Sequence, residues 1–240
     1  MKSTAVVMTL LAVAGIGGVV AYQAAARERD YRLHLRAGDA ARRDDQIFTA
    51  IQEYSGAIAL RPDSMLAHLR RGEIYRQRGE LDAAALDFRI ASSLDPSAPR
   101  PLEAFGDVRY QQERFADAVE AYESRLRLDD RSHEVTYKLA LARYRNRDLD
   151  GALAALADTL RLNNRLAEAH YVSGLVLRDK AQPAEARDAF ERAAALSPAM
   201  IPAREELADL YGAAGRQSDE LEQLQLIAGL DRQRVERWPR

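Results

Sequence analysis

Histidines are the side chains in this sequence best suited to metal binding or proton transfer, and three of the four recur at one interval. His34 and His68 lie 34 residues apart, and His170 falls at the same phase of that interval. Equivalent positions in stacked helical units are separated by about a helix diameter, ~10 Å. Because zinc is bound at ~2 Å, these side chains could not share one ion. We interpret them as packing residues; His133 lies outside the column.

The sequence lacks the local motifs on which common enzyme sites are built. It contains no GxxxxGK[ST] phosphate loop, no HExxH and no GxSxG. The glycines at residues 15–18 lie inside an apolar stretch, where they make a small-residue helix face. Cysteine is absent, which excludes disulfides and thiolate chemistry. We therefore predict a non-enzymatic protein with no catalytic residue, cofactor or metal site.

The composition is that of a folded chain with little net charge. The 240 residues carry a formal net charge of −2, and 47% of them are hydrophobic, which suffices for one or two packed domains. Such a balance provides no general cationic field, so we predict no nucleic-acid partner. Alanine is abundant and arginine outnumbers lysine, a bias that we associate with a GC-rich bacterial genome.

The first part of the chain is apolar over a length that could cross a bilayer. No residue from Ser3 to Ala26 is charged. At ~1.5 Å per residue, a helix of this length spans a ~30 Å hydrocarbon layer. We predict a transmembrane helix at residues 4–26, within an N-terminal anchor and junction at residues 1–30. The predicted location is a membrane, as a single-pass protein of the bacterial inner membrane.

Two features of this segment leave alternatives open. Small residues at Ala24–Ala26 could be a cleavage site, in which case residues 1–26 are a signal peptide and the product is secreted or periplasmic. The four arginines at residues 27–36 favour a cytoplasmic location for the rest of the chain by the positive-inside rule. The short, lysine-bearing N-terminus favours the opposite side, so the orientation stays open.

Beyond Asp30, a shift of 34 residues aligns almost the whole chain with itself. One column is always leucine: Leu60, Leu94, Leu128, Leu162, Leu196, Leu230. A second holds only glycine or alanine: Gly38, Gly72, Gly106, Ala140, Gly174, Ala208. A third is large and apolar: Tyr54, Phe88, Tyr122, Leu156, Phe190, Leu224. Small residues opposite large ones predict helices that interlock at close range.

The run LAHLRRGEIYRQRGELDAAALDFRIASSLDP contains a helix pattern, a polar break and a second helix pattern. It resembles a tetratricopeptide repeat, a helix–turn–helix unit of 34 residues. The resemblance covers residues 31–234 and leaves a short tail at residues 235–240. It divides the chain into six repeats: 31–64, 65–98, 99–132, 133–166, 167–200 and 201–234.

The resemblance implies an all-α fold, a right-handed α-solenoid of about six 34-residue helix–turn–helix repeats with a concave groove, here preceded by a single transmembrane helix. No helix breaker separates Tyr22 from Arg43, so we expect one continuous helix from the apolar segment into the first repeat. Glu220 and Gln223 replace packing residues in the last repeat, which predicts a cap with a polar outer face.

By the same resemblance, the first helix of each repeat lines the groove. Helical spacing then selects the candidate partner-binding residues: Glu73, Arg76, Asp107, Tyr110, Tyr137, Leu141, Tyr144, Tyr171, Leu175 and Arg178. Tyrosine and arginine often carry binding energy, although these stripes could equally pack against the next repeat. In the first repeats this face carries acids at Asp39, Glu73 and Asp107, with Arg42 and Arg76 one turn later, so we expect a polar rim that is acidic. These acids disfavour a site for a chaperone's terminal carboxylate.

The function predicted from these patterns is a membrane-tethered scaffold that binds a partner peptide or helix in the groove. One alternative is a self-associating oligomer at the membrane, formed through the repeat ends or the groove. Another is a secreted or periplasmic protein with an accessory role in glycan binding or envelope assembly. The sequence names neither the partner nor the biological process.

Overall fold

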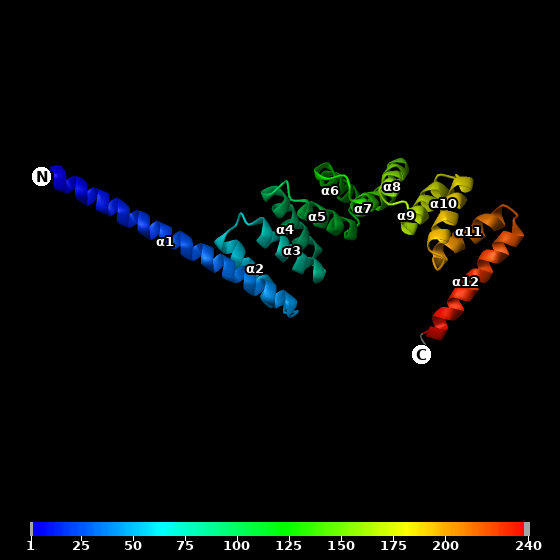
Figure 1. Cartoon of the computed structure of the whole chain (residues 1–240), viewed down its shortest axis with the longest axis horizontal. Helices are drawn as coiled ribbons and strands as arrows, with labels where there is room; N and C mark the ends of the chain where they lie inside the picture. The colour runs from blue at the N-terminus through cyan, green and yellow to red at the C-terminus, as the bar shows by residue number, and fades with distance from the viewer. Residues whose placement is uncertain (1, 238–240) are drawn as a thin grey trace. The chain divides into compact units, whose positions relative to one another are not determined.

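The computed structural model describes the backbone of residues 2–237 and the side chains of residues 19–232, and every regular element in these ranges is an α-helix. The helices form two compact units, unit 1 at Met1–Gln111 and unit 2 at Gln112–Arg240. The helices of unit 1 are α1 (Lys2–Arg43), α2 (Ile47–Leu60), α3 (Met65–Gln77), α4 (Leu81–Leu94) and α5 (Pro99–Gln111) (Figure 1).

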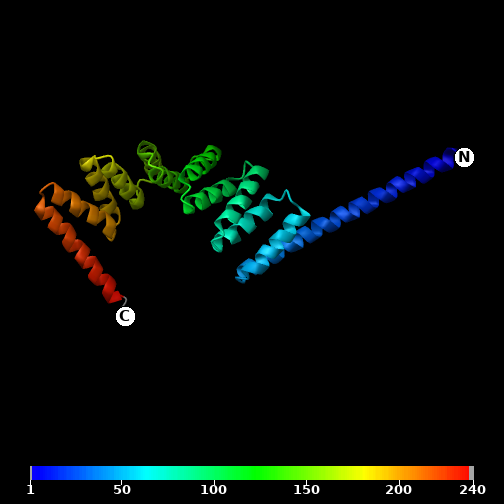
Figure 2. The same ribbon diagram turned by 180° about the vertical axis from the view of Figure 1, so that it is seen from behind.

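Unit 2 contains the remaining helices, which Figure 2 shows from behind. They are α6 (Phe115–Leu128), α7 (His133–Arg145), α8 (Leu149–Leu162), α9 (Ala167–Asp179), α10 (Pro183–Leu196), α11 (Ile201–Ala213) and α12 (Gln217–Arg237). Within each unit, first and second helices alternate, and they pack as the hairpins α1–α2, α3–α4, α7–α8, α9–α10 and α11–α12. The prediction of an all-α chain of helix–turn–helix repeats is confirmed.

Interlocking side chains hold hairpins within the units together, as the small and large columns predict. Phe88 on α4 is fully buried and its ring lies against Gly72 on α3. Tyr54 on α2 lies in the same way against Gly38 on α1. A side chain larger than hydrogen at these positions would hold the helices apart. The repeat columns therefore encode the distance between paired helices.

The turn inside each hairpin contains one residue in the left-handed region, always at the same phase. Glycine occupies it twice, as Gly79 and Gly215, with φ of 79° and 70°. The other four residues have a Cβ atom and adopt φ values of 55–65°: Asp45, Glu113, Arg147 and Ala181. Left-handed conformation costs such residues roughly 1–2 kcal/mol. Four of the six turns thus adopt a geometry that their own residue does not favour.

Helix α1 is continuous from Lys2 to Arg43, as the absence of a helix breaker predicts, and its second half packs on α2 through Tyr31 and Leu35. The hydroxyl groups of Tyr31 and Ser64 lie 2.6 Å apart, and Ser64 also accepts a hydrogen bond from the Ala67 backbone at the start of α3. This link connects α1 to the beginning of the second repeat.

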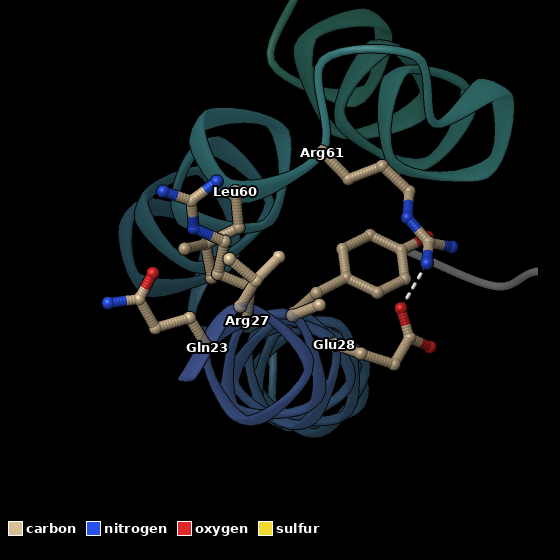
Figure 3. A pocket seen from close by; sticks show the side chains of 8 residues that line it. Gln23, Arg27, Glu28, Leu60 and Arg61 are labelled. Carbon is tan, nitrogen blue, oxygen red and sulfur yellow. Dashed lines mark hydrogen bonds and ion pairs between the residues drawn. The ribbon is translucent and has the colours of Figure 1, made fainter. Parts of the chain in front are cut away.

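A small pocket of about 290 Å³ lies beside this link, between α1 and the end of α2 (Figure 3). The guanidinium of Arg61 lies 4.3 Å from the centre of the Tyr31 ring and pairs with Glu28. Gln23 and Arg27 on α1 complete the polar side of the pocket. These contacts hold the middle of α1 against the repeat.

The prediction of a single-pass membrane protein is wrong: over the residues that the structure describes, no helix is both long and apolar enough to cross a membrane. The predicted span at residues 4–26 falls on α1, and the side chains of residues 2–18 lie outside the described residues. Within the residues whose side chains are described, the apolar stretch ends at Ala26, before Arg27 and Glu28.

The last helix differs from the predicted polar cap. Although Glu220 and Gln223 replace packing residues, Leu221, Leu224 and Leu226 are exposed on α12. No further helix of the described chain packs beyond α12, and these leucines therefore remain in contact with solvent. The outer face of the final hairpin is thus partly apolar.

Candidate functional site

The residues predicted to line a groove fall on the first helices of the hairpins, in two groups. Glu73 and Arg76 lie on α3 and Asp107 and Tyr110 on α5, all in unit 1. The other six lie on α7 and α9 of unit 2: Tyr137, Leu141, Tyr144, Tyr171, Leu175 and Arg178. Only Arg178 is exposed, and the other nine are half-buried. Because the groups belong to separate units, each is a surface of its own.

In unit 1, the acidic residues of the first helices are paired with arginines of neighbouring hairpins. The Glu73 carboxylate accepts a hydrogen bond of 2.6 Å from Arg100, at the start of α5. Arg76 donates to Asp107 over 3.4 Å, and Arg70 donates to Asp39. The sequence led us to expect an acidic rim, but cross-hairpin ion pairs neutralise it.

Two of these arginines, Arg76 and Arg100, line a cavity of about 450 Å³ in unit 1. Three cationic side chains face it with one carboxylate, and two amide side chains add hydrogen-bonding groups. We name this site the arginine cavity. It is lined by Arg42, Glu73, Ile74, Arg76, Gln77, Arg100 and Gln111. Guanidinium groups can bind a carboxylate through two parallel hydrogen bonds. The cavity is therefore suited to an anionic group.

Arg42 differs from the other two arginines of the cavity in its interactions. Its side chain is exposed, and among the described residues it forms no ion pair. Arg76 and Arg100 also line the cavity, while each holds an acidic partner. Sequence reasoning placed Arg42 and Arg76 on one face but missed Arg100. The sequence signal that could have identified Arg100 is its spacing of 27 residues from Glu73. That spacing indicates an ion pair only when two successive repeats are aligned in register.

In unit 2, the six predicted residues form a second surface, which we name the tyrosine surface. The hydroxyl of Tyr144 on α7 donates a hydrogen bond of 2.9 Å to Asp179 at the end of α9. Burial and the neighbouring carboxylate raise the pKa of Tyr144 above its usual value. Arg147 also approaches Asp179, at 3.8 Å. Tyr144 is thus held in a fixed orientation between two hairpins.

The α9 side of the tyrosine surface is partly structural. The ring of Tyr171 lies 5.8 Å from that of Phe190, and Tyr171 and Leu175 pack against the core around α10. Arg178 donates to both carboxylate oxygens of Glu206 at 2.5 and 2.6 Å, which raises the pKa of Arg178. Half-buried rings and a fixed guanidinium leave a rigid mixed surface.

Each recurring histidine makes a hydrogen bond within its own repeat or to the loop that precedes its helix. Nδ1 of His34 lies 2.8 Å from Glu53, and Nδ1 of His68 lies 2.9 Å from Asp87. Nε2 of His170 lies 3.2 Å from the Asn164 carbonyl oxygen. Each ring thereby links its helix either to the second helix of the hairpin or to the preceding loop.

Around His68, sequence reasoning missed a buried ionic network. Asp87 on α4 is almost completely buried and accepts hydrogen bonds of 2.8 and 2.9 Å from Arg71. Arg71 also donates to Ser55 on α2 at 3.0 Å. This carboxylate raises the pKa of Arg71 and anchors three helices of unit 1 to one another.

Comparison with solved structures finds proteins of similar fold at low identity. The crystal structure of MamA is 23% identical, with a TM-score of 0.67, over 69% of this chain and 96% of that one. YrrB, described as a TPR protein with an unusual peptide-binding site, is 21% identical with a TM-score of 0.62, over 74% and 91%. The Pseudomonas aeruginosa pilF protein is 18% identical with a TM-score of 0.64, over 89% and 94%.

The sequence itself matches one protein-family model. No curated protein matches the chain. The model of the tetratricopeptide repeat matches residues 35–99, 103–166 and 137–201, which together make up more than half of the chain. These ranges contain the small and large column residues of the first five repeats. The chain belongs to the tetratricopeptide repeat family.

Proposed function

We propose that the protein is a non-enzymatic scaffold that binds a segment of a partner protein on the first helices of its repeats. The arginine cavity is the observation that carries this proposal. It combines a volume of about 450 Å³ with three guanidinium groups and two amide side chains. Such a site has room for one or two side chains of a peptide and provides donors for its backbone carbonyls.

The charge of the arginine cavity favours an acidic segment. Arg42, Arg76 and Arg100 outnumber Glu73 in the lining, and Arg42 has no acidic partner among the described residues. A carboxylate entering the cavity would meet Arg42 without displacing an internal ion pair. Charge-assisted hydrogen bonds of this kind are about twice as strong as neutral ones.

The tyrosine surface of unit 2 gives the scaffold a second binding region. It contains tyrosines and an arginine, residue types that often carry binding energy at protein interfaces, and its leucines add apolar area. Tyr144 is already fixed by Asp179, and Arg178 by Glu206. Ordering these side chains on binding therefore costs little conformational entropy. YrrB, described as containing a peptide-binding site, has a similar fold, which supports a peptide as the ligand class.

A random peptide library displayed on phage tests the proposal when it is selected on the full chain. We expect enriched peptides to be acidic and to bind the wild-type protein in fluorescence anisotropy. Arg42→Glu should weaken their binding at least tenfold, because the unpaired guanidinium becomes a repelling carboxylate. The matched control is Arg165→Glu, the same change at an exposed loop residue of unit 2.

Two results would contradict the proposal. The first is enrichment of peptides without acidic residues. The second is an equal loss of affinity in Arg42→Glu and Arg165→Glu, which would indicate only a general electrostatic effect. Circular dichroism of each variant checks that the helical content is unchanged.

A further inference from the structure

One column of the repeat is buried in every hairpin except the last. Its large apolar residue is 0–2% exposed in five repeats: Tyr54, Phe88, Tyr122, Leu156 and Phe190. In the sixth repeat, Leu224 on α12 is 47% exposed. The change in burial does not come from a change in chemistry, because Leu156 is also leucine and is 1% exposed.

A second column shows the same contrast at the opposite end. The first helices of five repeats bury this residue almost completely: Ala67, Pro101, Val135, Ala169 and Ala203. In the first repeat, Leu33 on α1 is 53% exposed. A leucine half in contact with water forgoes about half of the free energy that full burial would supply.

Both contrasts have the same origin in the way successive hairpins stack. Within each unit, a second helix packs against the first helix of the next hairpin, as α2 does on α3 and α10 on α11. The described chain supplies no first helix to cover α12 and no second helix to cover α1. The surfaces around Leu224 and Leu33 are therefore the two separated halves of one repeated junction.

Charged residues at the two ends of the repeat array also correspond to the residues that form ion pairs between internal hairpins. Between the first and second hairpins Asp39 pairs with Arg70, a residue 31 positions later. In the repeat register, Asp209 on α11 is equivalent to Asp39, and Arg36 on α1 is equivalent to Arg70. Asp209 and Arg36 are exposed, and neither forms an ion pair among the described residues.

A second internal pair repeats the pattern of charges. Glu73 pairs with Arg100, 27 positions later. Their equivalents at the two ends are again Asp209 and, on α1, Arg32. Arg32 is bound to Glu28, which lies on the same helix and is partly exposed. By repeat register, Asp209 at one end of the repeat array is thus the expected partner of Arg32 and Arg36 at the other end.

We propose that copies of this protein associate head to tail, with α11 and α12 of one copy packed on α1 of the next. The contact buries Leu224 of one copy and Leu33 of the other, and it pairs Asp209 with Arg36. It uses different surfaces on the two partners, so each copy can bind one neighbour at each end. The occupant of both exposed ends is a second copy of the chain, independent of the proposed peptide binding.

Charge reversal with the full chain tests this junction, using sedimentation velocity over a range of concentrations. Wild-type protein is expected to show a mass that increases with concentration. Asp209→Arg alone and Arg36→Asp alone should each weaken association at least tenfold, because like charges then meet. An equimolar mixture of the two variants should associate again, since every contact in an alternating array joins opposite charges.

The mixed sample and the control variant distinguish head-to-tail association from other modes of association. Arg165→Asp, an equal charge change on an internal loop, should associate like the wild type. A monomeric wild type at all concentrations would overturn the proposal. So would normal association of Arg36→Asp alone, since this result would mean that association does not depend on the contact between Asp209 and Arg36. If the mixed variants fail to associate although circular dichroism shows both to be folded, the junction is also disproved.

Discussion

The ring of Phe88 lies so close to Gly72 that a Cβ atom at Gly72 would be 2.8 Å from Cε1 of the ring. Real Cβ atoms do not approach other carbon atoms to this distance. The repeat columns show the same matching of sizes elsewhere. In the sequence columns, glycine is matched with an aromatic residue in four repeats, whereas Ala140 and Ala208 are matched with Leu156 and Leu224. By these columns, the space between the two helices of a repeat is filled either by an aromatic side chain matched with glycine or by leucine matched with alanine.

Gly72→Ala should lower the free energy of unfolding by about 1–3 kcal/mol, because the added methyl group overpacks a buried contact. In Gly72→Ala/Phe88→Leu, the smaller side chain should remove most of this clash, as in the alanine–leucine repeats. Urea unfolding of the wild type, both single variants and the double variant gives the coupling energy. Strictly additive effects would show that Phe88 is not the source of the clash.

Ala181→Gly should stabilise the protein by up to about 1 kcal/mol. Ala181 adopts a φ of 57° between α9 and α10, which is strained for alanine and relaxed for glycine. The gain is reduced by the larger chain entropy of glycine in the unfolded state. Thermal unfolding measures the change. Ala195→Gly, at an exposed position inside α10, is the control and should destabilise by roughly 0.5–1 kcal/mol.

Asp87→Ala should cost about 3–5 kcal/mol of stability, because it leaves the guanidinium of Arg71 without its carboxylate in the protein interior. Asp158→Ala removes the partner of Arg161 on exposed helix surface and should cost at most about 1 kcal/mol. Urea unfolding compares the two variants. Similar losses in both would mean that burial does not strengthen the Asp87 network.

Stability should decrease as pH rises from about 10 to about 12. Burial, together with the hydrogen bond to Asp39, raises the pKa of Tyr54 from 10.0 to about 12. In this range the unfolded chain releases the proton that the folded protein retains, so each added pH unit destabilises the fold by ~1.4 kcal/mol. Burial and Glu191 raise the pKa of Tyr211 to about 12 as well, with the same sign.

Tyr54→Phe identifies the source of this alkaline effect. The variant loses the hydrogen bond to Asp39, and its free energy of unfolding should decline less steeply with pH between 10 and 12. Urea unfolding at several pH values measures the slope. An unchanged slope would show that the ionisation of Tyr54 is not coupled to folding.

Tyr144→Ala or Tyr171→Ala should weaken binding of selected peptides by more than ~1 kcal/mol if the tyrosine surface is part of the binding region. Fluorescence anisotropy measures the affinity, and circular dichroism monitors the helical content. Tyr144→Phe is the control, because it keeps the ring and loses only the hydrogen bond to Asp179. Full affinity in both alanine variants would place the interface away from this surface.

The histidine column shows how far a sequence pattern can lead. Recurrence at one phase correctly indicated that His34, His68 and His170 serve the repeat. It did not reveal that His68 belongs to a network with Asp87 and Arg71, since no sequence pattern distinguishes Asp87 from an acid on the surface of a helix. A buried ion pair between two helices depends on their relative rotation, which a single sequence does not specify.

The sequence by itself determined the repeat, its period and the matched sizes of Gly72 and Phe88, because these follow from spacing that holds in every unit. Tertiary structure alone decided which charges neutralise one another. Glu73 was expected to make an acidic rim, and instead it pairs with Arg100 of the next hairpin, beside a cavity rich in arginine. Helical periodicity fixes the face on which a side chain lies, but its partner depends on how neighbouring hairpins stack.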